Sequence, residues 1–216
     1  MGIRGLAEIL ADAAGGVFPP PDGSVTVVPQ PSPREAGVAA FAAHAVVFTD
    51  EDPDWVRETL AAAPGDPLSA PLCLPFLTAF AERTGRTVNN IDLLTVADRL
   101  PGAPPLPLTP VGDRKHPRVV RALRYREDVR VYETDGGVLI LGRGVAGRWE
   151  TAVEVDPHAQ GRGLGRALAV AGRHLLPSGG TVWAQQAPGN APSVRAFQAA
   201  GYRPIGAEVL LVAGRP

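Results

Sequence analysis

Five prolines fall between residues 101 and 110, and this run constrains the possible folds more than any other feature of the sequence. Proline fixes φ and lacks a backbone donor, so neither a helix nor a central strand continues through such a segment. The run is typical of a stiff, extended connector. It predicts two domains, an N-terminal domain of residues 1–105 and a C-terminal domain of residues 106–216.

Composition excludes several classes of protein. The 216 residues carry 21 basic and 22 acidic side chains, so no overall field favours nucleic acid or an anionic membrane. No apolar run approaches the roughly 20 residues of a membrane helix, and Glu8 and Asp12 interrupt any apolar signal-peptide core. One cysteine, Cys73, and four scattered histidines indicate no internal disulfide and no metal site. We expect a cytoplasmic, metal-free protein that binds neither nucleic acid nor membrane.

The N-terminal half has the alternating helix and strand signals of an α/β unit. Asp52 is a suitable N-cap for a helix that starts at Pro53. Gly85 is a suitable C-cap for a second helix, around residues 72–84. Helix signals also follow Arg34. The expected strands are residues 25–28, 44–49 and 91–96, and a further helix is expected near the N-terminus.

The C-terminal half predicts a mixed sheet built around an antiparallel meander. Asp-Gly and Gly-Gly turns divide β-patterned runs, as in successive hairpins. A helix is expected over residues 117–126, meander strands near 129–134, 138–142 and 149–155, and later strands at 181–185 and 207–212. The fold class predicted for the whole chain is therefore mixed α/β, with the N-terminal α/β domain the smaller of the two.

Gly142-x-Gly144-x-x-Gly147 matches the spacing of a dinucleotide-binding loop. That loop requires a helix that opens at the last glycine, so that its N-terminus faces a pyrophosphate. Residues 148–155 have a β pattern instead, which favours a hairpin turn. A pyridine-nucleotide enzyme would require a helix that starts at Gly147.

A second glycine-rich stretch, Gln160–Gly165, lies between a strand ending at Val155 and a helix with one apolar face. Glycines at the start of a helix leave its free N–H groups and the positive end of its dipole open to a ligand. This arrangement predicts a pyrophosphate-binding turn. The stretch lacks the Gly-Lys-Ser/Thr ending of the nucleotide-triphosphate loop, which disfavours magnesium-ATP chemistry.

Val155-x-Pro157-x-x-Gln160-x-x-Gly163-x-Gly165 resembles the acetyl-CoA signature of the GNAT superfamily of N-acetyltransferases. Further residues resemble the later asparagine, helix and Gly-aromatic pattern of that family: Asn190, Ala191, Ser193, Arg195, Phe197, Gly201 and Tyr202. The resemblance covers about the last half of the chain, and the whole arrangement suggests the glycine-acyltransferase-like branch. The N-terminal half carries no such signature, so it is either a degenerate copy of the same fold or a cap that shapes the acceptor site.

The resemblance implies a GNAT-like acyl-CoA-binding fold with acetyl-CoA as co-substrate and no metal. It further implies direct transfer of the acetyl group to an acceptor amine, without a covalent enzyme intermediate. In the family the pantetheine arm pairs with the end of the strand before the turn. The residues that would bind the cofactor are Val153, Glu154, Val155, Gln160, Gly161, Arg162, Gly163, Leu164, Gly165, Arg166, Asn190 and Ser193.

Acetyl transfer needs a group that accepts the amine proton and a group that protonates the leaving thiolate. Glu150 and Glu154 alternate onto one face of their strand, and each is a candidate proton acceptor or a solvated strand residue. The family's usual tyrosine acid is replaced by Phe197. Tyr202, Tyr132 or water remains as proton donor, although Tyr202 stands where the family places a packing aromatic.

The acceptor is open between a small-molecule amine and a protein amine, and a homodimer is also open. The basic run from Arg114 to Arg126 predicts a solvated helix face, or one that attracts an acidic acceptor or the CoA phosphates. Phe197 in place of the usual acid motivates a rival hypothesis, in which the domain is a non-catalytic CoA-binding or regulatory module.

Overall fold

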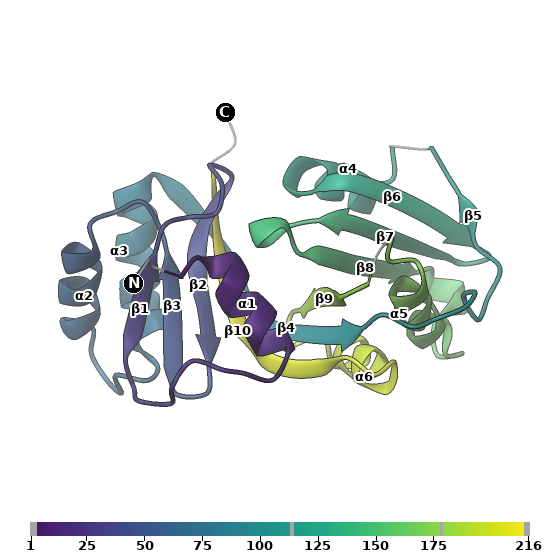
Figure 1. The fold of residues 1–216 in the computed structure, drawn as a ribbon. Helices are drawn as coiled ribbons and strands as arrows, with labels where there is room; N and C mark the ends of the chain where they lie inside the picture. Colours follow the sequence, from purple (N-terminus) through teal and green to yellow (C-terminus); the bar gives the residue numbers. More distant parts are fainter. Residues whose placement is uncertain (1–3, 113–114, 178, 214–216) are drawn as a thin grey trace. The chain divides into compact units, whose positions relative to one another are not determined.

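The computed structural model describes residues 4–112, 115–177 and 179–213 (Figure 1). They divide into two compact units. Unit 1 holds the residues up to Leu93 together with those from Ile205 onward, and unit 2 holds Leu94–Pro204. Both units combine helices with strands, which confirms the mixed α/β fold class. Among the described residues, no helix combines the length and apolarity needed to cross a membrane.

Unit 1 is built on a mixed sheet. β1 is parallel to β3, whereas β2 is antiparallel both to β3 and to β10. The strand order is β1 (Val25–Val28), β3 (His44–Phe48), β2 (Glu35–Phe41), β10 (Arg203–Ala213) and β4 (Arg86–Asp98). The end of β4 and the start of β10 belong to unit 2. The strands predicted at residues 25–28 and 44–49 are confirmed.

The helix predicted after Arg34 is wrong, because residues Glu35–Phe41 form strand β2. Six of its seven residues are buried, and β2 pairs with a strand on each side. A Cβ at Gly37 would lie 2.3 Å from the Val209 carbonyl oxygen, so the neighbouring strand fits closely against this glycine. Short apolar runs do not separate a buried strand from a buried helix, and here the two ladders decide.

Three helices accompany this sheet, and local signals define two of their ends. The Asp52 side chain accepts a hydrogen bond from the Asp54 N–H at 2.8 Å, and Gly85 ends a helix at φ 63°. The helices are α1 (Leu6–Ala14), α2 (Pro53–Ala61) and α3 (Leu74–Thr84), with a 3₁₀ turn η1 at Ala70–Leu72. Val56, Leu60, Phe76, Leu77 and Phe80 pack with strand residues Val38, Val47 and Val209 in one core.

Unit 2 contains the predicted antiparallel meander. Strands β5, β6, β7 and β8 pair antiparallel in succession, and β9 is parallel to β8. The strands are β5 (Thr109–Pro110), β6 (Glu127–Thr134), β7 (Gly137–Arg143), β8 (Trp149–Val155) and β9 (Thr181–Gln186), and the end of β4 lies beside β9. Two 3₁₀ turns, η2 (Val145–Gly147) and η3 (Pro157–Ala159), lie before and after β8.

Helices cover both faces of this meander. α4 (Pro117–Tyr125) packs with Val138 and Ile140 of β7, whereas α5 (Leu164–His174) packs with Leu139 between them. Successive strand residues point to opposite faces, so α4 and α5 lie on opposite sides of the sheet. α6 (Ala191–Ala199) contributes Phe197 to a further core with Ala169 of α5. The turn after β8 therefore opens directly into a helix held on the sheet.

The proline-rich run lies inside unit 2, and part of it is more than a connector. Leu106 and Leu108 pack on the core that includes α5. Thr109 and Pro110 pair with the edge strand β6. The division into compact units falls at residues 93/94 and 204/205 and differs from the boundary predicted at 105/106.

A polar cluster in unit 1 predicts how its stability depends on pH. Asp22 accepts a hydrogen bond from the Ser24 N–H at 2.9 Å and lies 3.1 Å from His44 Nδ1. Hydrogen bonds from the Ser24 side chain and backbone, and then from His44, lower the pKa of Asp22 from 3.8 to about 2. Because the folded state favours the ionised form, Asp22 stabilises the protein above about pH 4 and loses this effect as pH falls toward 2.

Asp22→Asn should therefore lower the unfolding free energy at neutral pH and flatten its decline between about pH 4 and 2. Urea unfolding followed across that range measures both effects. Glu82→Gln, at an exposed position of α3, is the matched control and should keep the wild-type slope. An unchanged slope in Asp22→Asn would contradict the assignment.

Candidate functional site

β8 and β9 begin side by side and then stop pairing. The paired residues are Trp149 with Val182 and Glu150 with Trp183, whereas β8 continues to Val155 and β9 to Gln186. The described ladder therefore ends near the middle of β9 and early in β8. Backbone groups of β8 beyond Glu150 on the β9 side are thus available to a ligand that adds as a strand.

The turn after β8 leaves the N-terminus of α5 open. Gly161 has φ 76° and Gly163, the N-cap, has φ 84°, a region that favours glycine. A Cβ at either position would meet no atom within 4 Å, so the backbone faces open space. The first N–H groups of a helix lack partners within it and carry the positive end of its dipole. This geometry fits an anionic group such as a pyrophosphate.

Side chains around the turn fix its position. Gln160 Nε2 donates to the Val155 carbonyl oxygen at 3.1 Å and so ties the turn to the end of β8. A Cβ at Gly165 would lie 3.6 Å from Val155 Cγ2 and 3.9 Å from Ala196 Cβ, so α5 runs close to both β8 and α6. The remaining predicted cofactor residues fall here too: Val153 and Val155 on β8, Leu164 packed on the α5 core, and Arg162 and Arg166 exposed in the turn and first helical turn.

Asn190 and Ser193 lie at the start of α6. The Asn190 side-chain oxygen accepts a hydrogen bond from the Ser193 N–H at 3.2 Å, so Asn190 is the N-cap of this helix. Its amide nitrogen is the donor end of the same side chain. The pair therefore has a structural role in the fold, and a ligand role for it remains a prediction.

Glu150 is buried and held by two guanidinium groups. Arg126 Nε and Arg148 Nε each lie 2.9 Å from a different oxygen of its carboxylate. Burial by itself raises the pKa of Glu150, but the two arginines outweigh it and the pKa lies below its usual value. A buried carboxylate with a lowered pKa, whose two oxygens are both bound by arginines, is a weak proton acceptor. The structure therefore does not support the predicted role of Glu150 as a general base.

The same ion pairs explain the first glycine motif. A Cβ at Gly142 would lie 3.0 Å from Arg126 Cβ, and one at Gly144 would lie 2.3 Å from the Glu150 carboxyl carbon. Gly147 has φ 74° in the turn that leads into β8. The predicted turn is confirmed, and the helix that a dinucleotide site requires does not start there. The contacts of Arg126 and Arg148 with Glu150 were not predicted from the sequence, which placed Arg126 only in the basic run.

Glu154 lies on the same face of β8 in a different environment. Its side chain is 43% exposed and forms an ion pair with Arg118 of α4. It is thus the more accessible of the two predicted proton acceptors. Arg118 belongs to the basic run predicted as a solvated face, of which Arg114 lies outside the described residues.

Tyr202 is a packing residue in this structure. Its hydroxyl donates to the Ala169 carbonyl oxygen at 3.2 Å, and its ring meets Phe197 edge to face at 4.9 Å. The side chain is 2% exposed, and burial raises its pKa above the usual value. The hydroxyl is therefore not placed to protonate a leaving thiolate, and the predicted role of Tyr202 as a donor is not supported.

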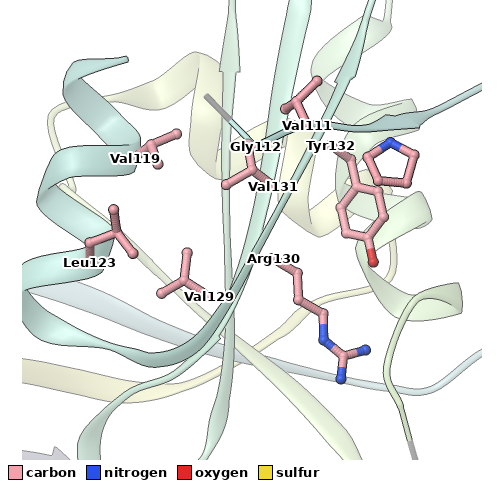
Figure 2. A pocket seen from close by; sticks show the side chains of 9 residues that line it. Val111, Gly112, Val119, Leu123, Val129, Arg130, Val131 and Tyr132 are labelled. Atoms are coloured by element: carbon pink, nitrogen blue, oxygen red, sulfur yellow. The ribbon is translucent and has the colours of Figure 1, made fainter. Parts of the chain in front are cut away.

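A cavity of about 260 Å³ lies between α4 and β6, and Figure 2 shows the side chains that line it. Its apolar wall includes Val119 and Leu123 from the helix and Val129 and Val131 from the strand. β6 lies two strands away from β8 in the sheet, so this cavity is separate from the glycine turn.

Comparisons with known proteins bear on the same segment. Residues 151–211, which run from β8 through α5, β9 and α6 into β10, match the family described as FR47-like protein. This segment is similar to the GNAT superfamily. The GNAT resemblance predicted from the motifs is thereby confirmed for the part of the chain that holds the glycine turn. No curated protein matches the chain.

Several solved GNAT structures are also similar. An acetyltransferase of the GNAT family from Colwellia psychrerythraea is 11% identical, with a TM-score of 0.42, over 64% of this chain and 62% of that chain. A GCN5-related N-acetyltransferase from Kribbella flavida is 16% identical, with a TM-score of 0.43, over 99% and 98%. A tandem GNAT protein from the clavulanic acid biosynthesis pathway is 18% identical, with a TM-score of 0.38, over 72% and 62%.

Tyr202→Phe tests the packing role. Loss of one buried hydrogen bond should lower the unfolding free energy by about 1 kcal/mol, which denaturant unfolding measures. Any acyl transfer by the protein should keep its rate and its alkaline pH dependence. A large fall in kcat with unchanged stability would instead restore Tyr202 as a proton donor.

Proposed function

We propose that the protein transfers an acetyl group from acetyl-CoA directly to an acceptor amine. The observation that carries the proposal is the open N-terminus of α5 beside the unpaired end of β8. The family match to residues 151–211 supports acyl transfer from CoA as the class of reaction. The choice of acetyl as the acyl group and of an amine as the acceptor comes from the motif resemblance.

The chain's own residues then divide the binding of CoA between them. Backbone N–H groups from Gly161 to Gly165 hold the pyrophosphate, and Arg162 and Arg166 add positive charge at the rim. Main-chain groups of Val153 and Val155 pair with the amides of the pantetheine arm, as an added strand would.

Glu154 is the proton acceptor in this proposal. Its exposure allows the amine proton to reach it directly or through one water molecule. Arg118 is ion-paired with this carboxylate and must yield part of its contact when the acceptor amine arrives. Tyr132 or water protonates the thiolate, because Phe197 offers no proton and the Tyr202 hydroxyl is engaged.

A non-catalytic CoA-binding module is the second candidate. Phe197 occupies the position of the family's acid, and both oxygens of Glu150 are committed to arginines. Both hypotheses require CoA binding, and turnover separates them. The acceptor remains either a small-molecule amine or a protein amine.

Binding of acetyl-CoA should raise the melting temperature. At about 100 times its dissociation constant a ligand adds about 2.7 kcal/mol, which for a chain of this size corresponds to roughly 5 to 11 °C. Thermal unfolding with acetyl-CoA, and with NAD and ATP as controls, measures the effect. A shift only with NAD, or no shift at all, would contradict the proposed site.

Gly163→Asp and Gly163→Asn form a matched pair for the same turn. Both residues tolerate the left-handed conformation better than other side chains, and they differ by one negative charge. The aspartate variant should lose most of its affinity for CoA, because its charge lies beside the pyrophosphate, and the asparagine variant should lose less. Isothermal titration measures both, and equal affinities would place the phosphates elsewhere.

Glu154→Gln should lower kcat for CoA release with an amine while the affinity for acetyl-CoA changes little. General-base catalysis contributes about 10²- to 10⁴-fold, so the rate should fall by at least about tenfold near neutral pH. Glu133→Gln is the control. Glu133 of β6 and Glu154 of β8 pair with the same residue of β7, Val138, so the two glutamates lie two strands apart at the same level of the sheet. Equal rates in both variants would assign the proton acceptor to another group.

A further inference from the structure

One buried carboxylate joins three segments of unit 2, namely the end of α4, the start of β8 and β9. The Glu150 carboxylate of β8 accepts hydrogen bonds from Arg126, at the end of α4, and from Arg148, directly before β8. Gln185 Nε2 of β9 donates a third at 3.4 Å. Glu150 is 3% exposed, and the side chains of Arg126 and Arg148 are 13% and 5% exposed. We refer to these four residues as the Glu150 cluster.

The cluster lies where β8 and β9 stop pairing. Glu150 belongs to the second described pair of the β8–β9 ladder, opposite Trp183. Gln185 is two residues further along β9, so its bond to Glu150 links the strands past that pair. Arg148 also lies over the Trp183 ring at 5.1 Å. Side chains thus connect the two strands at the point where the backbone ladder ends.

The surrounding backbone is adapted to this cluster. Gly142 and Gly144 provide the space that the Arg126 side chain and the Glu150 carboxylate occupy. Arg126 Nη1 is buried and, among the described residues, has no hydrogen-bond partner. Burying these charges costs free energy, and apolar residues of similar volume are often as stable. Stability alone therefore does not account for the cluster, whereas a geometric role does.

We infer that Glu150 and Arg126 are positioning residues that fix the opening between β8 and β9, and so the course of Thr151–Val155 toward the pantetheine arm. This inference rests on the proposed function. It assigns the buried Glu150 carboxylate to CoA binding and keeps Glu154 as the acceptor of the amine proton.

Glu150→Gln, Arg126→Gln and the double variant test the inference in the full-length chain. Each single variant should weaken CoA binding by roughly ten- to a hundredfold, and the double variant should lose no more than the worse single one, because both act on one unit. Isothermal titration with CoA gives the affinities. With acetyl-CoA and an amine, KM for acetyl-CoA should rise while the acid limb of the kcat profile stays in place.

Gly144→Ala tests the same geometry without removing a charge. Its Cβ must displace the Glu150 carboxylate, so CoA affinity should fall in the same direction as in the charge variants. Gly112→Ala is the matched control, because a Cβ there meets no atom within 4 Å. This pair keeps the test decisive if Glu150→Gln fails to fold.

The outcomes separate the roles. Lower melting temperatures with unchanged CoA affinity and kinetics would mark the cluster as structural only and overturn the inference. A loss of kcat and of its acid limb in Glu150→Gln, with normal Arg126→Gln, would make Glu150 the base and also overturn it. If the wild-type chain binds no CoA, the proposed function fails with it. If the wild type and every variant bind CoA equally, only the inference fails.

Discussion

The free backbone at the start of α5 is the constraint on which the rest of unit 2 depends. A helix N-terminus is useful to an anion only if no side chain covers it and the helix cannot move away. Gly161 and Gly163 meet the first condition, because neither carries a side chain and the space beside each is open. Burial of Leu168 and Ala171 against β7 meets the second, and Gln160 fixes the turn to the end of β8.

Local sequence signals made several helix ends and turns of both units predictable. The cap at Asp52, the stop at Gly85 and the turn at Gly163 each act through the backbone of a few neighbouring residues, so the sequence shows them directly. The hairpins of the meander have the same origin, since Asp135 to Gly137 allows the reversal between β6 and β7.

Long-range contacts account for what the sequence did not reveal. Ala-rich β2 is a strand only because β3 and β10 pair with it on both sides. Glu150 had the position expected of a base, but its partner Arg126 is 24 residues earlier in the chain, and no local pattern announces their contact. Gly142 and Gly144, two glycines of the motif that matches a dinucleotide-binding loop, were the one available signal. They leave the space that the Arg126 and Glu150 side chains occupy.

The position of β10 has a consequence for synthesis of the protein. β10 follows every other strand in the sequence, yet in the sheet it lies between β2 and β4. Domains generally fold in the order in which the ribosome releases them, but unit 1 cannot close its sheet until β10 has emerged. Until then the edges of β2 and β4 are unpaired and open to other strands. Folding of unit 1 is therefore completed only after the residues of β10, Arg203–Ala213, have been translated.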